Sequence, residues 1–72
     1  MKLKNELTGD TLELPPPNEL GESCVLFNGK VVASVLYSDE TNSVTLGDGR
    51  IFSIEEWPQF VVKNLKDGWV KA

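Results

Sequence analysis

An Asn28-Gly29 pair stands between two runs of apolar and β-branched residues, and it constrains the fold more than any other feature of the chain. Both residues tolerate the positive φ angles of a type I′ turn, so the pair predicts a tight β-hairpin. A polar loop at 39–42 and a second tight turn at 47–49 follow, each between further short apolar runs. The sequence therefore predicts a four-stranded antiparallel meander over residues 23–54.

The loop lengths predict a register for this meander, with two-residue loops at Asn28-Gly29 and Asp48-Gly49 and a four-residue loop between them. The expected pairs are Phe27 with Lys30, Leu26 with Val31, Val25 with Val32, Ser38 with Ser43, Val35 with Leu46, and Leu46 with Ile51. In this register both faces of the sheet carry apolar residues, although a sheet with one wet face alternates more cleanly. We therefore expect the second face to be covered by the C-terminal segment, by another chain or by curling of the sheet.

Two further segments precede the meander. Residues 2–14 predict an N-terminal hairpin that turns around Thr8-Gly9-Asp10. Three prolines then open a connector over residues 15–22, because each proline ring fixes φ and removes a backbone donor. We interpret the connector as a stiff spacer rather than a ligand for a proline-recognising domain.

The C-terminal segment, residues 55–72, allows two interpretations. Ser53 and Glu56 have the spacing of a capping box, and Pro58 predicts that the helical turn ends near Trp57. The favoured continuation is a last hairpin in which residues 60–64 pair with 69–71, because Val61-Val62 is typical of strands. The alternative is a short helix that starts at Pro58, ends at Lys66 and is capped by Gly68.

Together these elements predict a single, mainly β domain over residues 1–72, with an α+β arrangement carrying one short C-terminal helix as the alternative. A meander followed by a helical turn and a closing strand resembles the small SH3-like barrels. The resemblance concerns the order of the elements, and no ligand-binding motif of signalling SH3 domains accompanies it. It implies an architecture and no function.

The composition argues against an enzyme or a metalloprotein. The chain has no His and one cysteine, Cys24, so it has neither a base to activate a thiol nor the ligands of a structural zinc site. The adjacent carboxylates Asp39-Glu40 and Glu55-Glu56 are the only paired candidates for acid–base chemistry. Solvation and the helix dipole explain these pairs better. We predict no catalytic residue, no metal site and no cofactor.

The charge is unevenly distributed along the chain. Residues 5–56 hold ten acidic residues against Lys30 and Arg50, which gives a net charge of −8 within a total of −4. Such a surface repels phosphate backbones, which argues against nucleic-acid binding except by the basic termini. No apolar run is long enough for a signal peptide or a membrane span, and the single cysteine suits a reducing compartment. We expect a cytoplasmic, free-standing protein.

These properties favour a small acidic module that acts by binding another protein, such as an accessory factor or inhibitor encoded by a bacterium or a phage. Acidic loops and exposed aromatic side chains would make the contact. The candidate partner-binding residues are Tyr37, Asp39, Glu40, Glu55, Glu56, Trp57 and Trp69. One alternative is a self-associating structural subunit, for which a homodimer is the simplest form, since so short a chain buries little surface. The other is a nucleic-acid-binding barrel that uses the basic termini.

Overall fold

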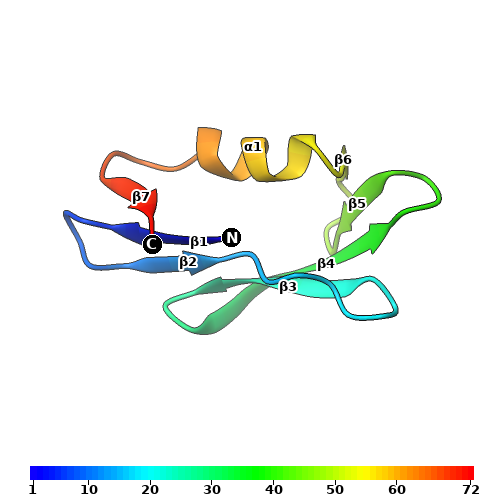
Figure 1. The fold of residues 1–72 in the computed structure, drawn as a ribbon, viewed down its shortest axis with the longest axis horizontal. Coiled ribbons are helices and arrows are strands. Elements are labelled where there is room, and N and C mark those ends of the chain that lie inside the picture. Colours follow the sequence, from blue (N-terminus) through cyan, green and yellow to red (C-terminus); the bar gives the residue numbers. More distant parts are fainter.

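Seven antiparallel strands lie side by side in the order β6-β5-β4-β3-β2-β1-β7, so only β7 is out of chain order. The computed structural model describes residues 1–72. Its elements are β1 (Lys2–Asn5), β2 (Thr11–Glu13), β3 (Glu22–Phe27), β4 (Lys30–Ser38), β5 (Ser43–Leu46), β6 (Ile51–Ser53), α1 (Glu56–Lys63) and β7 (Trp69–Lys71). The sheet curls, and α1 spans the space between the edge strands β6 and β7, which do not pair with each other (Figure 1). The fold is therefore mainly β with a single C-terminal helix, and the sheet is an open half-barrel.

The predicted meander is confirmed as β3 to β6. Asn28 and Gly29 both have positive φ, 52° and 80°, as the turn between β3 and β4 requires. Four of the predicted pairs are present. They are Phe27 with Lys30, Leu26 with Val31, Ser38 with Ser43, and Val35 with Leu46.

A register shift within the β3–β4 hairpin overturns the predicted pairing of Val25 with Val32. Val25 pairs with Ala33, while Leu26 next to it still pairs with Val31. Val32 is therefore the extra residue of a β-bulge, which leaves one residue without a partner. The shift places Val25 on the same face as Ala33 and Val35, and this face is the buried one.

The turn between β5 and β6 is one residue longer than predicted. The loop is Gly47-Asp48-Gly49, with Gly49 at a φ of 94°, so Ile51 pairs with Thr45 rather than with Leu46. Because a slip of one residue moves every side chain to the other face, Ile51 is exposed. The same slip packs the half-buried side chain of Phe52 against the hydrophobic core.

The chain ends meet at one edge of the sheet. The N-terminal hairpin is confirmed, with Leu3 of β1 paired to Leu12 of β2. On the other side of β1, Asn5 pairs with Trp69 and Leu3 with Lys71. The predicted hairpin between residues 60–64 and the last strand is wrong, because β7 pairs with β1 instead.

Residues 56–63 form a helix, so the favoured strand interpretation of this segment is wrong and the helical alternative is closer. Pro58 is the third residue of α1, within the first turn, where backbone N–H groups have no intrahelical partner. The predicted capping box is wrong in its position: the Ser53 hydroxyl does accept a hydrogen bond from the Glu56 N–H at 3.1 Å, but the N-cap is Glu55 and Glu56 is the first helical residue. The helix ends at Lys63, with Asn64 as its C-cap, before the predicted Lys66.

The core lies between the concave face of the sheet and α1. The buried apolar residues are Leu3, Leu12, Leu14, Val25, Val35, Val44, Leu46 and Trp57. Trp57 is 4 % exposed and packs with Phe52 and Phe60, at ring-centroid distances of 5.6 Å and 6.2 Å. Aromatic contacts of this kind add to the burial of apolar area. One aromatic cluster thus fixes the helix to the sheet.

The single helix is too short to cross a membrane.

Candidate functional site

A groove of about 510 Å³ lies between the connector and the β4–β5 loop. Its lining residues are Pro17, Asn18, Glu19, Leu20, Gly21, Tyr37, Ser38, Asp39, Glu40 and Ile54. The carboxylates of both walls are exposed, and the lining includes no lysine or arginine. We refer to it as the acidic groove.

The connector wall is held in place by a turn centred on Asn18. Its side-chain oxygen accepts hydrogen bonds from the backbone N–H groups of Leu20 and Glu22, at 3.0 Å and 2.9 Å. Gly21 then docks this turn on β4, because its carbonyl oxygen accepts from the Tyr37 N–H at 2.7 Å. Gly21 has a φ of 84°, and a Cβ there would overlap the Tyr37 carbonyl oxygen. The turn leaves Leu20 77 % exposed at the rim of the groove.

The opposite wall is formed by the end of β4 and the loop that follows it. Asn42, with a positive φ of 50°, accepts a backbone hydrogen bond from Ile54 at 3.2 Å and donates from its side chain to Glu55 at 3.0 Å. This side-chain hydrogen bond is the main reason why the pKa of Glu55 lies below its usual range. The hydrogen bond thus positions the Glu55 carboxylate beside the acidic groove.

Tyr37 joins the groove to the core. Tyr37 is half-buried, and this burial raises its pKa above the usual value for tyrosine. The nearby indole N–H of Trp57 lowers the pKa of Tyr37, but by less than burial raises it. The position of the indole falls outside hydrogen-bonding geometry, so the Nε1 atom of Trp57 is buried without a partner. Tyr37 therefore presents one side to the groove and the other to the helix.

The negative charge around the groove is not neutralised within the molecule. The chain has one salt bridge, between Arg50 and Asp48 at 2.9 Å, and both of its side chains are more than half exposed. No other carboxylate forms a salt bridge within the chain. The acidic residues of the groove and of the adjoining start of α1 are Glu19, Asp39, Glu40, Glu55 and Glu56, which together we call the acidic end.

The structure separates the seven residues predicted from the sequence. It brings Tyr37, Asp39 and Glu40 together in one groove, and it places Glu55 and Glu56 beside that groove. Trp57 belongs to the core, so its side chain offers no surface to a partner. Trp69 lies at the opposite end of the molecule, whose longest dimension is 39 Å.

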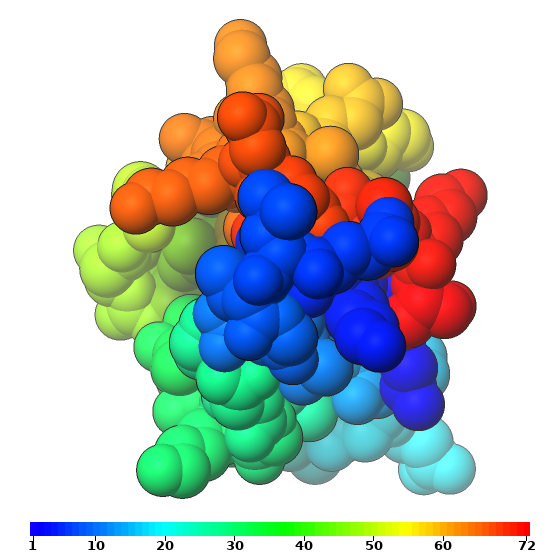
Figure 2. All heavy atoms as spheres, turned by 90° about the vertical axis from the view of Figure 1, so that its left-hand side faces the viewer, coloured from blue at the N-terminus to red at the C-terminus, as the bar shows by residue number.

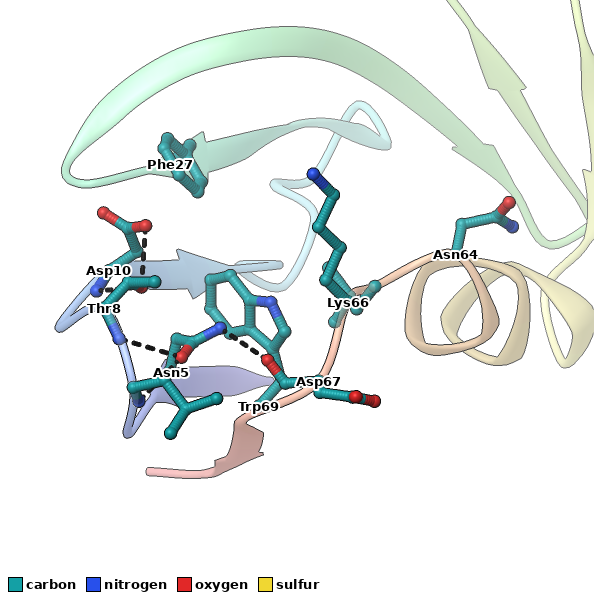
Figure 3. Close-up of a pocket in the computed structure, with 10 residues that line it drawn as sticks. Asn5, Thr8, Asp10, Phe27, Asn64, Lys66, Asp67 and Trp69 are labelled. Atoms are coloured by element: carbon teal, nitrogen blue, oxygen red, sulfur yellow. Dashed lines mark hydrogen bonds between the residues drawn. The ribbon is translucent and has the colours of Figure 1, made fainter.

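A larger pocket of about 790 Å³ surrounds Trp69. Figure 2 looks at this end, where the β1–β2 turn lies between the segment that follows α1 and the β3–β4 turn. In Figure 3 the Trp69 indole lies in the middle of the lining residues, and the Lys66 side chain extends past it toward the side of Phe27. Trp69 and Phe27 are in tilted contact, with ring centroids 6.3 Å apart. The two side chains form an aromatic wall within the pocket.

The polar residues of this pocket carry both signs of charge. Asp10 accepts hydrogen bonds from Asn28 and Thr8, at 2.9 Å and 2.8 Å, and these bonds lower the pKa of its carboxyl. Lys66 and Asp67 add one charge of each sign. The pocket is therefore amphipathic rather than strongly acidic or basic.

Sequence reasoning missed Asn5, Leu20 and Glu19. Asn5 is the one buried polar residue, and its side chain joins the β1–β2 turn to the loop before β7 by accepting from Leu7 and donating to the Asp67 carbonyl oxygen. Leu20 and Glu19 looked like members of a plain spacer. The only sequence feature that indicates this docked turn is Gly21 directly before β3, because a glycine there allows a tight turn against the sheet.

No three His, Cys, Asp or Glu side chains are grouped closely enough to hold a metal ion. Cys24 is a free, half-buried thiol on β3. Comparisons with protein-family models, with curated proteins and with solved structures gave no match, so the geometry of the two pockets is the basis for assigning a function.

Proposed function

We propose that this protein is an interaction module that binds a basic surface of another protein through its acidic end. One observation carries the proposal: the fold gathers Glu19, Asp39 and Glu40 around a single groove, and none of them has a cationic partner within the chain. Uncompensated charges of one sign attract a partner of the opposite sign and raise the rate of encounter. Leu20 and Tyr37 would add apolar contact once the surfaces meet.

The pattern of contacts favours a protein partner over a nucleic acid. Pairing of β1 with β7 does bring the basic residues Lys2, Lys4 and Lys71 to one edge of the sheet. However, Glu13 pairs directly with Lys2, and Glu6 follows β1, so the edge has no strongly positive field. Phosphate binding requires several uncompensated cations.

The test compares the rates at which the wild-type chain and two triple variants associate with a captured partner protein. The first variant, Glu19→Gln, Asp39→Asn and Glu40→Gln, removes three charges from the acidic groove. Proteins captured from native lysate by the wild-type chain are identified, and the association rate of the captured partner is measured at several salt concentrations. We expect the variant to associate about tenfold or more slowly at low salt, since steering contributes at least this much. The wild-type rate should fall as salt is added.

The matched control carries Glu6→Gln, Glu13→Gln and Asp67→Asn, which removes the same number of charges away from the groove. It should capture the same partner at close to the wild-type rate. Equal rates for the two triple variants would show that only net charge matters. A wild-type association rate that does not depend on salt would refute the electrostatic basis of the proposal.

A further inference from the structure

The turn between β3 and β4 brings a side-chain amide next to an accessible backbone nitrogen. Asn28 is the only asparagine that is followed by a glycine, and both residues of the turn are exposed. The Gly29 N–H makes no backbone hydrogen bond, and a Cβ at Gly29 would have no atom within 4 Å. The Gly29 nitrogen is therefore free to approach the side-chain amide carbon of Asn28, which makes an asparagine of this kind chemically labile.

We infer that Asn28 is a modification site at which the chain deamidates, and that the product weakens the contact between the β1–β2 and β3–β4 hairpins. The Gly29 nitrogen loses its proton to a solvent base and forms a bond to Cγ of Asn28. The bond between Cγ and the side-chain nitrogen breaks, and this nitrogen leaves as ammonia with a proton from solvent.

Water then opens the cyclic imide that this step forms. Cleavage of the bond from Cγ to the Gly29 nitrogen gives aspartate, and cleavage at the main-chain carbonyl carbon of residue 28 gives isoaspartate. Water is the only co-reactant, and no atom is oxidised or reduced. The product carries one more negative charge than the −4 of the unmodified chain.

Three hydrogen bonds join Asn28 to the β1–β2 hairpin, and we call them the Asn28 bridge. The Asn28 N–H donates to the Thr11 carbonyl oxygen at 2.9 Å, and the side-chain oxygen of Asn28 accepts from the Thr11 N–H at 2.8 Å. The side-chain NH₂ group donates to the Asp10 carboxylate at 2.9 Å. Only two residue pairs join β2 to β3, so the bridge is a large part of the contact between the hairpins. Figure 2 shows the two hairpin turns next to each other.

The Asn28 bridge slows the modification in the folded chain. Attack requires the side chain of Asn28 to turn toward Gly29, whereas Thr11 and Asp10 hold both of its polar atoms. The Asp10 carboxylate is itself fixed, because its second oxygen accepts from the Thr8 hydroxyl at 2.8 Å. One ordinary and one charge-assisted hydrogen bond must therefore open before the reaction can begin. We expect the folded chain to deamidate at least about tenfold more slowly than the unfolded chain.

The modification replaces an attraction with a repulsion. A carboxylate at position 28 has no N–H to donate, so two carboxylates would face each other where Asn28 and Asp10 are 2.9 Å apart. The isoaspartate product also disturbs the turn, because it adds a backbone atom to a two-residue loop whose angles fit a type I′ turn. Asp10 and Phe27 both line the pocket around Trp69, so separation of the hairpins would widen that pocket.

The first experiment follows the reaction in three samples of the full chain in mildly alkaline buffer: folded wild type, folded Asp10→Ala, and wild type in urea. Peptide mapping by mass spectrometry identifies the modified residue, and the release of ammonia gives the rate. We expect Asn28 to be the first asparagine modified in every sample. Asp10→Ala should react about fivefold or more faster than the folded wild type, and the chain in urea should react fastest.

Three results of this experiment would overturn the inference. Modification of another asparagine before Asn28 in the folded chain would remove the site. An Asp10→Ala rate equal to that of the folded wild type would show that the Asn28 bridge does not restrain the side chain. Equal rates for the folded chain and for the chain in urea would show the same.

The second experiment measures the consequence of the modification by urea unfolding. Asn28→Asp has the structure of the aspartate product and should raise the equilibrium constant for unfolding about tenfold or more. The matched control Gln59→Glu makes the same change from amide to carboxylate at an exposed position of α1, and it should change this constant by less than about threefold. Asp10→Asn in the Asn28→Asp background exchanges donor and acceptor, so it should recover most of the lost stability.

Two results of the unfolding experiment would contradict the inference. An Asn28→Asp chain as stable as Gln59→Glu would show that the product does not weaken the contact between the hairpins. A double variant no more stable than Asn28→Asp alone would show that any loss does not arise from the carboxylate of Asp10.

Discussion

Substitution of Trp57 tests how the helix is attached to the sheet. Its indole is almost fully buried against Phe52 and Phe60, and its N–H has no hydrogen-bond partner. Truncation of a buried tryptophan to alanine costs about 3–5 kcal/mol. A chain of 72 residues has a total stability of roughly 4–11 kcal/mol, so Trp57→Ala should remove much of it.

Trp57→Phe should behave very differently. Loss of part of the ring removes apolar contact worth about 2 kcal/mol. The same substitution removes a buried N–H that lacks a partner, and such a group costs about 1–3 kcal/mol. The two effects nearly cancel, so we expect the free energy of unfolding to change by about 1 kcal/mol or less.

Urea unfolding followed by far-UV circular dichroism measures both variants. With an m value of about 1 kcal/mol/M, Trp57→Ala should lower the midpoint by several molar, and Trp57→Phe by less than about 1 M. A loss of about 3 kcal/mol or more in Trp57→Phe would refute the reasoning, because the indole N–H would then be making a favourable contact. A loss below about 1 kcal/mol in Trp57→Ala would show that α1 is held by other residues.

Three further predictions concern the acidic end. Gly21→Ala should lower the free energy of unfolding by about 1–2 kcal/mol, because it puts a Cβ at positive φ against a backbone carbonyl. An unchanged midpoint of urea unfolding would contradict the docking of the connector on β4. Tyr37 is the only tyrosine, so the absorbance of its phenolate at about 295 nm, followed as a function of pH, reports its pKa directly. The midpoint of this pH titration should lie above the usual 10.0 in the folded chain and return to that value in urea. Glu55 has a lowered pKa in the folded state, so the stability that it contributes is present above its unfolded pKa and is lost as the pH falls through the folded value. The thermal unfolding temperatures of Glu55→Gln and of Asn42→Gly should therefore depend less on pH between about 5 and 3 than that of the wild type. If both variants lost stability with falling pH as steeply as the wild type, the Asn42–Glu55 hydrogen bond would not be the source of this pH dependence.

The candidate site was only partly predictable from the sequence. Tyr37, Asp39 and Glu40 are close in the chain, so a loop at the end of a strand was enough to group them. The wall that faces them was not foreseen, because Glu19 and Leu20 reach the groove only when the connector docks on β4. That docking depends on contacts across the fold rather than on the local sequence.

The C-terminal segment shows the same limit. A helical period is visible in this segment only when Trp57 is counted together with Phe60, Val61 and Leu65. Pro58 directly follows Trp57 and suggested that the helical turn ends there, which separated Trp57 from the other three residues. The proline is harmless because the helix starts two residues before it.

The Asn28-Gly29 turn and the polar loop at 39–42 determined the meander by local chemistry, since a turn selects its own backbone angles and fixes which strands are neighbours. The bulge at Val32 and the slip that packs Phe52 against the core were decided by the tertiary structure, because the core selects the register that places apolar side chains beneath α1. Pairing of β7 with β1 joins the two ends of the chain, and no local pattern can specify such a contact. The sequence by itself determined the strands of the centre, and the tertiary structure decided which face they bury and which face they leave open.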